Sequence, residues 1–218
     1  MKRFVLFLPG TYRKAHLEFY RRLCHKARLV AVDGGCRFFK AAGMTPDVII
    51  GDLDSVSSIP SQFHKKSQLL IYPEDKNKTD LQLALEYCVK ERARAVDIIS
   101  PGVGEVDHFL GNIMLLGLFD KLSGVPTRPK IRIVGADYEI LWVHDSCRSF
   151  SDCVGDRLSV IPMSAAIKLT CRGMEFTADR LRIARGHSHG LRNQITARRA
   201  SVEIEGKALV VHRLSYSK

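Results

Sequence analysis

The segment Ile49-Ile50-Gly51-Asp52-Leu53-Asp54-Ser55 ends an apolar run with two closely spaced carboxylates. The run Val48–Ile50 is typical of a short buried strand, and the glycine and acids that follow it are typical of a turn. The same order of apolar run, acidic turn and helical spacing recurs on both sides of this segment. This recurrence predicts a sheet of parallel strands whose ends carry acidic side chains.

Short apolar runs alternate with amphipathic stretches through the first part of the chain. This alternation predicts an α/β domain in which helices cover both faces of a parallel sheet. Ligands of such sheets bind beyond the carboxyl ends of the strands. The expected strands are Phe4–Leu8, Arg28–Val32, Val48–Ile50, Leu69–Ile71 and Ala95–Ile99, and the expected helices lie near residues 17–24, 38–42, 81–89 and 109–117.

The pattern changes after a turn-rich linker at residues 122–129. Short strands separated by turns follow it, with little helical periodicity, so we expect an all-β, sandwich-like second domain. The expected domains are residues 1–122 and residues 130–218. The expected strands of the second are Ile131–Val134, Ile140–Val143, Asp156–Ile161, Ala166–Cys171, Ser201–Glu205 and Ala208–Leu214.

Composition places the chain among ordinary globular proteins. Of its 218 residues, 45% are hydrophobic and 26% are charged, which excludes a disordered or collagen-like chain. No apolar run approaches the roughly 18 residues of a membrane helix, and the N-terminal run is too short for a signal peptide. The six cysteines form no CxxC pair, so we expect reduced thiols in a cytoplasmic protein, although Cys147 and Cys153 are spaced to pair across a hairpin.

The charge of the chain suggests an anionic partner. Lys and Arg number 34 and Asp and Glu 23, a net charge of +11, and residues 170–218 alone hold ten basic and four acidic residues. Nucleotide phosphates and nucleic acid both fit such an excess. Phe176 and Tyr216 are the only aromatic residues of this tail, so it offers few platforms on which bases stack.

Acidic residues follow successive expected strands. Asp33 comes after the second strand, Asp52 and Asp54 after the third, and Asp80 and Asp107 open the helices that follow the fourth and fifth. Each could be only a turn residue or a helix cap. Their recurrence at one sheet edge favours a cation that offsets their repulsion, and hard oxygen ligands suit Mg²⁺. The common phosphate-binding fingerprints GxxxxGK[ST] and GxGxxG are absent.

The order and spacing of these motifs resemble the thiamine pyrophosphokinase family over nearly the whole chain. Within the chain, Gly51–Ser55 followed by Thr79-Asp80 is the most specific part of the resemblance. The motifs are Asp33-Gly34-Gly35, Pro46-Asp47, Gly51–Ser55, Asp75-Lys76 with Thr79-Asp80, Asp107-His108 with Asn112, and Gly186–Gln194.

The resemblance implies a fold, an activity and an assembly. The fold is an α/β ATP-binding domain followed by a β-sandwich that binds thiamine. The activity is transfer of a pyrophosphoryl group from ATP to the hydroxyethyl oxygen of thiamine, which yields thiamine diphosphate and AMP. The protein would be a homodimer that holds thiamine where the subunits meet, with no nucleic acid or membrane partner.

The resemblance also implies roles for individual residues. Asp52, Asp54 and Asp80 would be the catalytic acids and Mg²⁺ ligands, with Asp33 in or next to the metal's shell. Lys76 would meet phosphate as a point charge, and the helix that begins near Thr79 would offer backbone N–H groups to an anion. The further expected substrate or nucleotide contacts are Asp33, Gly34, Gly35, Ser55, Asp107, His108, Asn112, Ser188 and Asn193.

Two departures from the family pattern concern charge. Glu105 stands where the family usually has an arginine before its Asp-His pair, and Arg192 and Gln194 stand where Ser and Glu are common. Two alternatives therefore accompany the thiamine assignment. One is a related pyrophosphokinase that acts on another alcohol, such as 6-hydroxymethyl-dihydropterin. The other is a nucleic-acid-binding module that uses the basic C-terminal tail.

Overall fold

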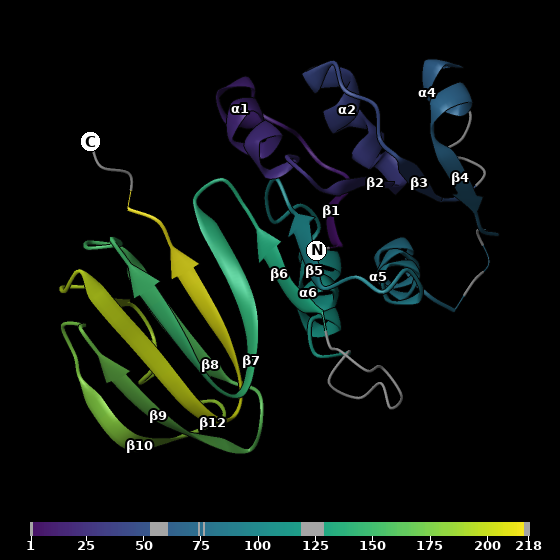
Figure 1. Ribbon diagram of the computed structural model, residues 1–218. Helices are drawn as coiled ribbons and strands as arrows, with labels where there is room; N and C mark the ends of the chain where they lie inside the picture. Colours follow the sequence, from purple (N-terminus) through teal and green to yellow (C-terminus); the bar gives the residue numbers. More distant parts are fainter. Residues whose placement is uncertain (1, 53–60, 74, 76, 119–128, 216–218) are drawn as a thin grey trace. The chain divides into compact units, whose positions relative to one another are not determined.

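The structure is a computed structural model that describes residues 2–52, 61–73, 75, 77–118 and 129–215 (Figure 1). The chain divides into two compact units, Met1–Ala136 and Asp137–Lys218. Among the described residues, no helix is both long enough and apolar enough to cross a lipid bilayer.

The first unit contains a sheet of parallel strands, as the sequence predicts. The strand order is β6-β5-β1-β2-β3-β4, and each neighbouring pair is parallel. Strand β1 therefore has β2 on one side and β5 on the other. The strands are β1 (Arg3–Phe7), β2 (Arg28–Val32), β3 (Val48–Gly51), β4 (Gln68–Ile71), β5 (Ala95–Ile99) and β6 (Lys130–Val134).

Helices cover both faces of this sheet because successive strand residues point to opposite faces and the side chains on both faces are apolar. Val5 and Phe7 of β1 join the core cluster that contains side chains of α1 and α2. Phe4 of the same strand points the other way, and its ring lies 6.2 Å from that of Tyr87 on α5. Figure 1 shows α1 and α2 on one side of the strands and α5 on the other. The helices are α1 (Lys14–Leu23), α2 (Cys36–Ala42), α4 (Ser61–Lys66), α5 (Asp80–Lys90) and α6 (Val106–Leu115).

Strand β6 corrects the expected boundary between the domains. The sequence analysis assigned Ile131–Val134 to an all-β domain that begins at residue 130. The strand instead pairs in parallel with β5, with Asp97 opposite Arg132, and the first unit extends to Ala136. Ile133 and Val134 are buried there, because the edge of β5 offers both backbone partners and an apolar surface. The predicted linker, apart from Pro129, lies outside the described residues.

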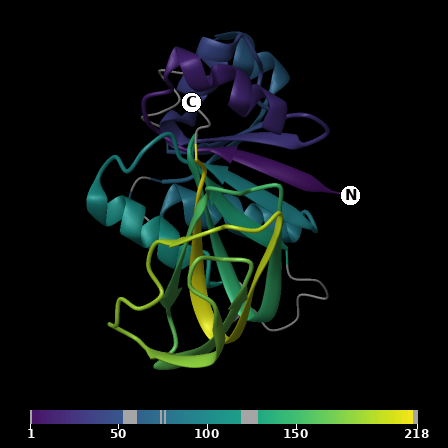
Figure 2. The ribbon, with the colours of Figure 1, turned by 90° about the vertical axis from the view of Figure 1, so that its left-hand side faces the viewer.

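The second unit is built from antiparallel pairs, drawn in green to yellow in Figures 1 and 2. Strand β12 pairs with β7 along most of its length, with β9 through its first half and with β8 through its second half. Both halves of β12 contribute buried side chains to one core cluster. The strands are β7 (Tyr138–Ser151), β8 (Arg157–Pro162), β9 (Ala166–Arg172), β10 (Ala178–Ala184), β11 (Asn193–Gln194) and β12 (Arg199–Arg213).

The two last strands expected from the sequence are one strand. The register of β12 shifts between Ile204 and Lys207, at Gly206, whose φ of 103° is a backbone conformation that favours glycine. The Gly206 N–H donates to the Asp145 carboxylate at 2.6 Å. The glycine therefore bends one long strand rather than separating two.

Candidate active site

The Asp33-Gly34-Gly35 turn (η1) is fixed by close packing against the end of β1. A Cβ atom on Gly35 would lie 1.9 Å from the carbonyl oxygen of Phe7, and one on Gly34 would lie 3.4 Å from Pro9. Asp33 itself has φ = 48°, a left-handed conformation that is uncommon for a residue with a side chain. The two glycines thus let the turn approach β1, and Asp33 is held at the carboxyl end of β2.

Asp52 lies at the same edge of the sheet as Asp33. Val32, which directly precedes Asp33, is paired with Ile50, which lies two residues before Asp52. Neighbouring strands are about 4.8 Å apart, so both residues begin loops at one edge of the sheet. The Tyr72 N–H donates to the Gly51 carbonyl at 2.9 Å and ties the end of β3 to β4.

Thr79 and Asp80 form the beginning of α5. The Thr79 hydroxyl oxygen accepts a hydrogen bond from the Gln82 N–H at 3.3 Å, so this residue caps the helix. Asp80 is half-buried in the first turn, and α5 packs against β2 and β3, the strands that precede Asp33 and Asp52. The three carboxylates are therefore positioned by neighbouring elements of one unit.

The oxygen donors of this edge suit a hard cation without forming a closed cage. In the part of the chain that the structure describes, the carboxylate oxygens of Asp33, Asp52 and Asp80 do not all lie within 4.8 Å of one another. Mg²⁺ is usually held by one or two carboxylates together with substrate phosphates and water. Three half-buried carboxylates at one edge fit that kind of site better than an all-protein cage.

Burial keeps the one thiol next to this turn protonated at neutral pH. Burial raises the pKa of the Cys36 thiol to about 11, and the neighbouring Asp33 carboxylate adds to the rise. A neutral thiol is a poor nucleophile. Cys36 is therefore not a candidate nucleophile at this edge.

The loops after β1 and β5 also belong to this edge, and the sequence analysis did not single out the first of them. A Cβ atom on Gly10 would lie 2.5 Å from the ring of Pro101, so the two loops touch. Strand β1 lies where the order of the strands reverses, the place at which α/β sheets bind ligands. The dipeptide Pro9-Gly10 directly after the first apolar run was the feature that could have indicated this loop.

The Asp107-His108 pair lies in the first turn of α6, where both side chains are exposed. The Asp107 carboxylate accepts the backbone N–H of His108 at 2.8 Å. Glu105 directly precedes the helix without a side-chain capping hydrogen bond, and its carboxylate lies 3.7 Å from the His108 ring nitrogen. Glu105, the acidic residue that stands in place of the family's usual arginine, is thus adjacent to His108. Asn112 is half-buried farther along the same helix.

Ser188 and Asn193 belong to the second unit, where Asn193 has a clear structural role. Its amide oxygen accepts the Phe176 N–H at 3.0 Å, and its amide nitrogen donates to the Phe176 carbonyl at 2.6 Å. Both amide groups therefore hold the loop between β9 and β10. Ser188 is exposed in the turn before β11.

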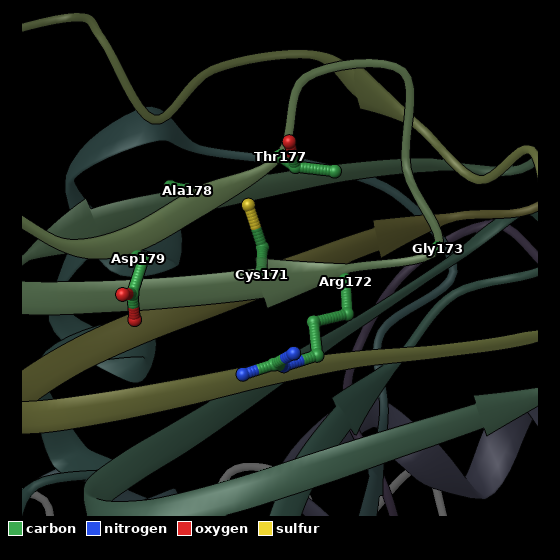
Figure 3. A pocket seen from close by; sticks show the side chains of 6 residues that line it. All are labelled: Cys171, Arg172, Gly173, Thr177, Ala178 and Asp179. Carbon is green, nitrogen blue, oxygen red and sulfur yellow. The ribbon is translucent and has the colours of Figure 1, made fainter.

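A surface hollow of about 430 Å³ borders the loop that Asn193 holds. Figure 3 shows Cys171 and Arg172, at the end of β9, pointing to opposite sides of the strand. Gly173 is required at this turn, since its φ is 72° and a Cβ atom would lie 2.4 Å from the Arg199 carbonyl. The lining residues are Cys171, Arg172, Gly173, Thr177, Ala178 and Asp179, none of which the sequence analysis proposed as a site residue.

Three predicted site residues, Asp54, Ser55 and Lys76, lie outside the described residues. One quoted motif residue lies away from the site. Asp47 precedes β3, and its carboxylate accepts the Leu29 N–H at 2.7 Å, so it joins the amino ends of β2 and β3.

Comparison with known proteins finds the same resemblance. The family described as thiamin pyrophosphokinase, catalytic domain, matches residues 20–124, which contain Asp33, Asp52, Asp80 and Asp107. A curated protein named thiamine pyrophosphokinase, from Bacillus subtilis (strain 168), is 28% identical over 188 residues, 84% of this chain and 86% of that protein. The resemblance to the thiamine pyrophosphokinase family is thus confirmed.

Solved thiamine pyrophosphokinase structures share the fold. The Bacillus subtilis structure has a TM-score of 0.79 at 24% identity and covers 98% of this chain and 99% of its own. The Candida albicans structure has a TM-score of 0.76 at 12% identity, with 98% and 89% covered. The mixed α/β architecture predicted from the sequence is therefore found in solved members of this family.

Proposed function

We propose that this protein transfers a pyrophosphoryl group from ATP to thiamine and yields thiamine diphosphate and AMP. The observation that carries the proposal is the placement of Asp33, Asp52 and Asp80 by neighbouring elements at one sheet edge, within the part of the chain that matches the family's catalytic domain. The chain's similarity to proteins named thiamine pyrophosphokinase supports the same reaction.

We assign the binding of ATP to the first unit and of Mg²⁺ to its carboxylates. Asp52, Asp54 and Asp80 would hold the ion, with Asp33 in or next to its shell. When bound, Mg²⁺ neutralises the charge of the triphosphate and the charge that develops during transfer. Thr79 retains a hydroxyl hydrogen to donate, because its oxygen accepts the capping hydrogen bond. The first N–H groups of α5 and the Lys76 ammonium favour an anion at the same edge.

We assign the binding of thiamine to the second unit, with Ser188 and Asn193 at the ligand's edge. Asn193 would contribute by shaping the site, because both polar atoms of its side-chain amide are hydrogen-bonded to the Phe176 backbone. The other proposed nucleotide contacts remain Gly34, Gly35, Ser55, Asp107, His108 and Asn112.

The nucleotide product tests the proposed reaction. Cleavage between the α and β phosphates must yield AMP, and thiamine diphosphate in equal amount. We expect both products, by chromatography, when the protein is incubated with ATP, Mg²⁺ and thiamine. ADP as the sole nucleotide product would refute pyrophosphoryl transfer.

The choice of alcohol needs a matched control. With 6-hydroxymethyl-dihydropterin in place of thiamine, we expect no AMP above the level seen without any acceptor. AMP release with the pterin alone would assign the chain to the alternative pyrophosphokinase.

We also propose a homodimer. The apolar segment Ala208–Val211 offers little surface for pairing, because Ala208, Leu209 and Val210 are buried within β12. The support comes instead from α6, which has no buried residue and exposes Val106, Leu110 and Met114 on successive turns. Light scattering at tens of micromolar should give about twice the mass of one chain, 24.5 kDa. A single-chain mass would contradict the proposal.

We place the protein in the cytoplasm without a nucleic-acid partner. All six cysteines are free thiols in the structure, which suits a reducing compartment. Cations of the basic tail are in part ion-paired, Arg180 with Glu205 at 2.5 Å and Arg198 with Asp152 at 2.7 Å. Binding of an oligonucleotide with a steep salt dependence would contradict this assignment.

A further inference from the structure

A mixed cluster of metal-ligating side chains lies inside the second unit, apart from the residues proposed for catalysis. Cys153 comes from the turn between β7 and β8, Asp156 from the start of β8, and His212 from the end of β12. One ligand atom of each lies within 4.8 Å of the other two. Asp156 is 7% exposed and His212 is 4% exposed, so two of the three are nearly withdrawn from water.

The outer contacts of the cluster orient its histidine and its carboxylate. The Nδ1 atom of His212 lies 3.2 Å from a carboxylate oxygen of Glu139, while its Nε2 atom faces Asp156. The Oδ1 atom of Asp156 accepts the backbone N–H of Ser215 at 2.6 Å and its hydroxyl at 2.9 Å. A carboxylate behind a histidine and donors behind a ligating carboxylate are the usual outer shell of a bound metal.

The inner atoms of the cluster are those that a borderline-soft metal prefers. The Nε2 of His212 and the Oδ2 of Asp156 are 2.6 Å apart, and the thiol of Cys153 lies beside them. Thiolate, imidazole and carboxylate together favour Zn²⁺ or Co²⁺ over Mg²⁺, which takes oxygen ligands alone. We propose that Cys153, Asp156 and His212 bind one divalent transition-metal ion of this class, with solvent as the fourth ligand.

The cluster needs only a small adjustment to receive the ion. Ligand atoms about 2.0–2.3 Å from a tetrahedral metal are roughly 3.3–3.7 Å from one another. The His212–Asp156 contact must therefore widen by about 1 Å, and the thiol must release its proton to solvent. The thiol now donates to the Ser151 carbonyl at 3.1 Å, a contact that the turn can exchange for the metal.

The competing explanation is a purely structural His212–Asp156 ion pair. In that explanation the pair only reinforces the backbone pairing between the end of β12 and the start of β8. It assigns no role to the Cys153 thiol, whereas the metal site requires it. Replacement of this cysteine therefore distinguishes the two, and the histidine and aspartate that stabilise the fold remain unchanged.

Cobalt binding tests the site in the full-length protein. After chelator treatment and exchange into a buffer with a non-thiol reductant, the protein is titrated with Co²⁺ at excess Mg²⁺. We expect a thiolate-to-cobalt charge-transfer band that saturates at one ion per chain and is bleached by Zn²⁺. Cys153→Ser should abolish the band and weaken Co²⁺ binding by more than about tenfold.

Cys147→Ser is the matched control, because it removes an exposed thiol of β7 and leaves the cluster intact. It should keep the full band. Circular dichroism verifies that both variants are folded. No saturable band in the wild-type protein, or an unchanged band in Cys153→Ser, would overturn the proposal. The readout is absorption rather than turnover, so its outcome is independent of the proposed pyrophosphoryl transfer.

Discussion

Asp52→Asn is expected to lower kcat/KM for the formation of thiamine diphosphate by about 10²–10³-fold, with thermal unfolding little changed. Asparagine keeps the shape of the side chain and can still form a turn, so the fold at the end of β3 should persist. It removes one negative charge from the carboxylates at this edge, and a neutral amide is a poor ligand for Mg²⁺ beside a triphosphate. The Mg²⁺ concentration for half-maximal activity should rise as well.

A matched loss of charge away from the site is the control. Glu18→Gln removes an exposed carboxylate on α1, where it pairs with Arg22 at 3.6 Å. It should leave kcat/KM and the Mg²⁺ concentration for half-maximal activity within about twofold of the wild-type values. Asp54→Asn and Asp80→Asn should behave like Asp52→Asn. Full turnover in all three would show that these acids only shape turns and caps.

The first unit was predictable because its local patterns agree with its tertiary structure. The runs Arg28–Val32 and Ala95–Ile99 are strands with the expected bounds. Both are nearly continuous apolar runs, as expected for strands buried on two faces. The acidic turns could be located for the same reason, since each follows such a run. Strand β6 was assigned to the wrong unit because an apolar run does not say which sheet edge it will join.

The second unit was harder to predict because exposed and bent strands have weaker patterns. Strand β10 is exposed at Arg180 and Leu181 and reads as polar, so it was missed. The length of β7 was underestimated, since only Ile140–Val143 is apolar enough to stand out. The cluster of Cys153, Asp156 and His212 was also missed, because its members are up to 59 residues apart in sequence and antiparallel pairing alone brings them together.

A buried charge cluster in the first unit supports the second large prediction. Asp97 on β5 has a side chain that is 6% exposed. It accepts the Arg3 Nε–H at 3.0 Å and the Arg132 Nε–H at 2.7 Å. The three residues lie on adjacent strands, β1, β5 and β6, so one carboxylate joins three strands. Its removal would take away the carboxylate that both guanidinium groups share.

Asp97→Ala is therefore expected to lower the free energy of unfolding of the first unit by about 3 kcal/mol, the low end of the range for breaking a buried pair, because both arginines are partly exposed. The described helices all lie in this unit, so helical circular dichroism in urea follows its unfolding. Trp142, the chain's one tryptophan, lies on β7, and its fluorescence should show the second unit unchanged.

Glu86→Ala, which breaks an exposed pair with Lys78, should cost less than about 1 kcal/mol. Equal losses in the two variants would mean that the Asp97 cluster contributes no more than a surface ion pair.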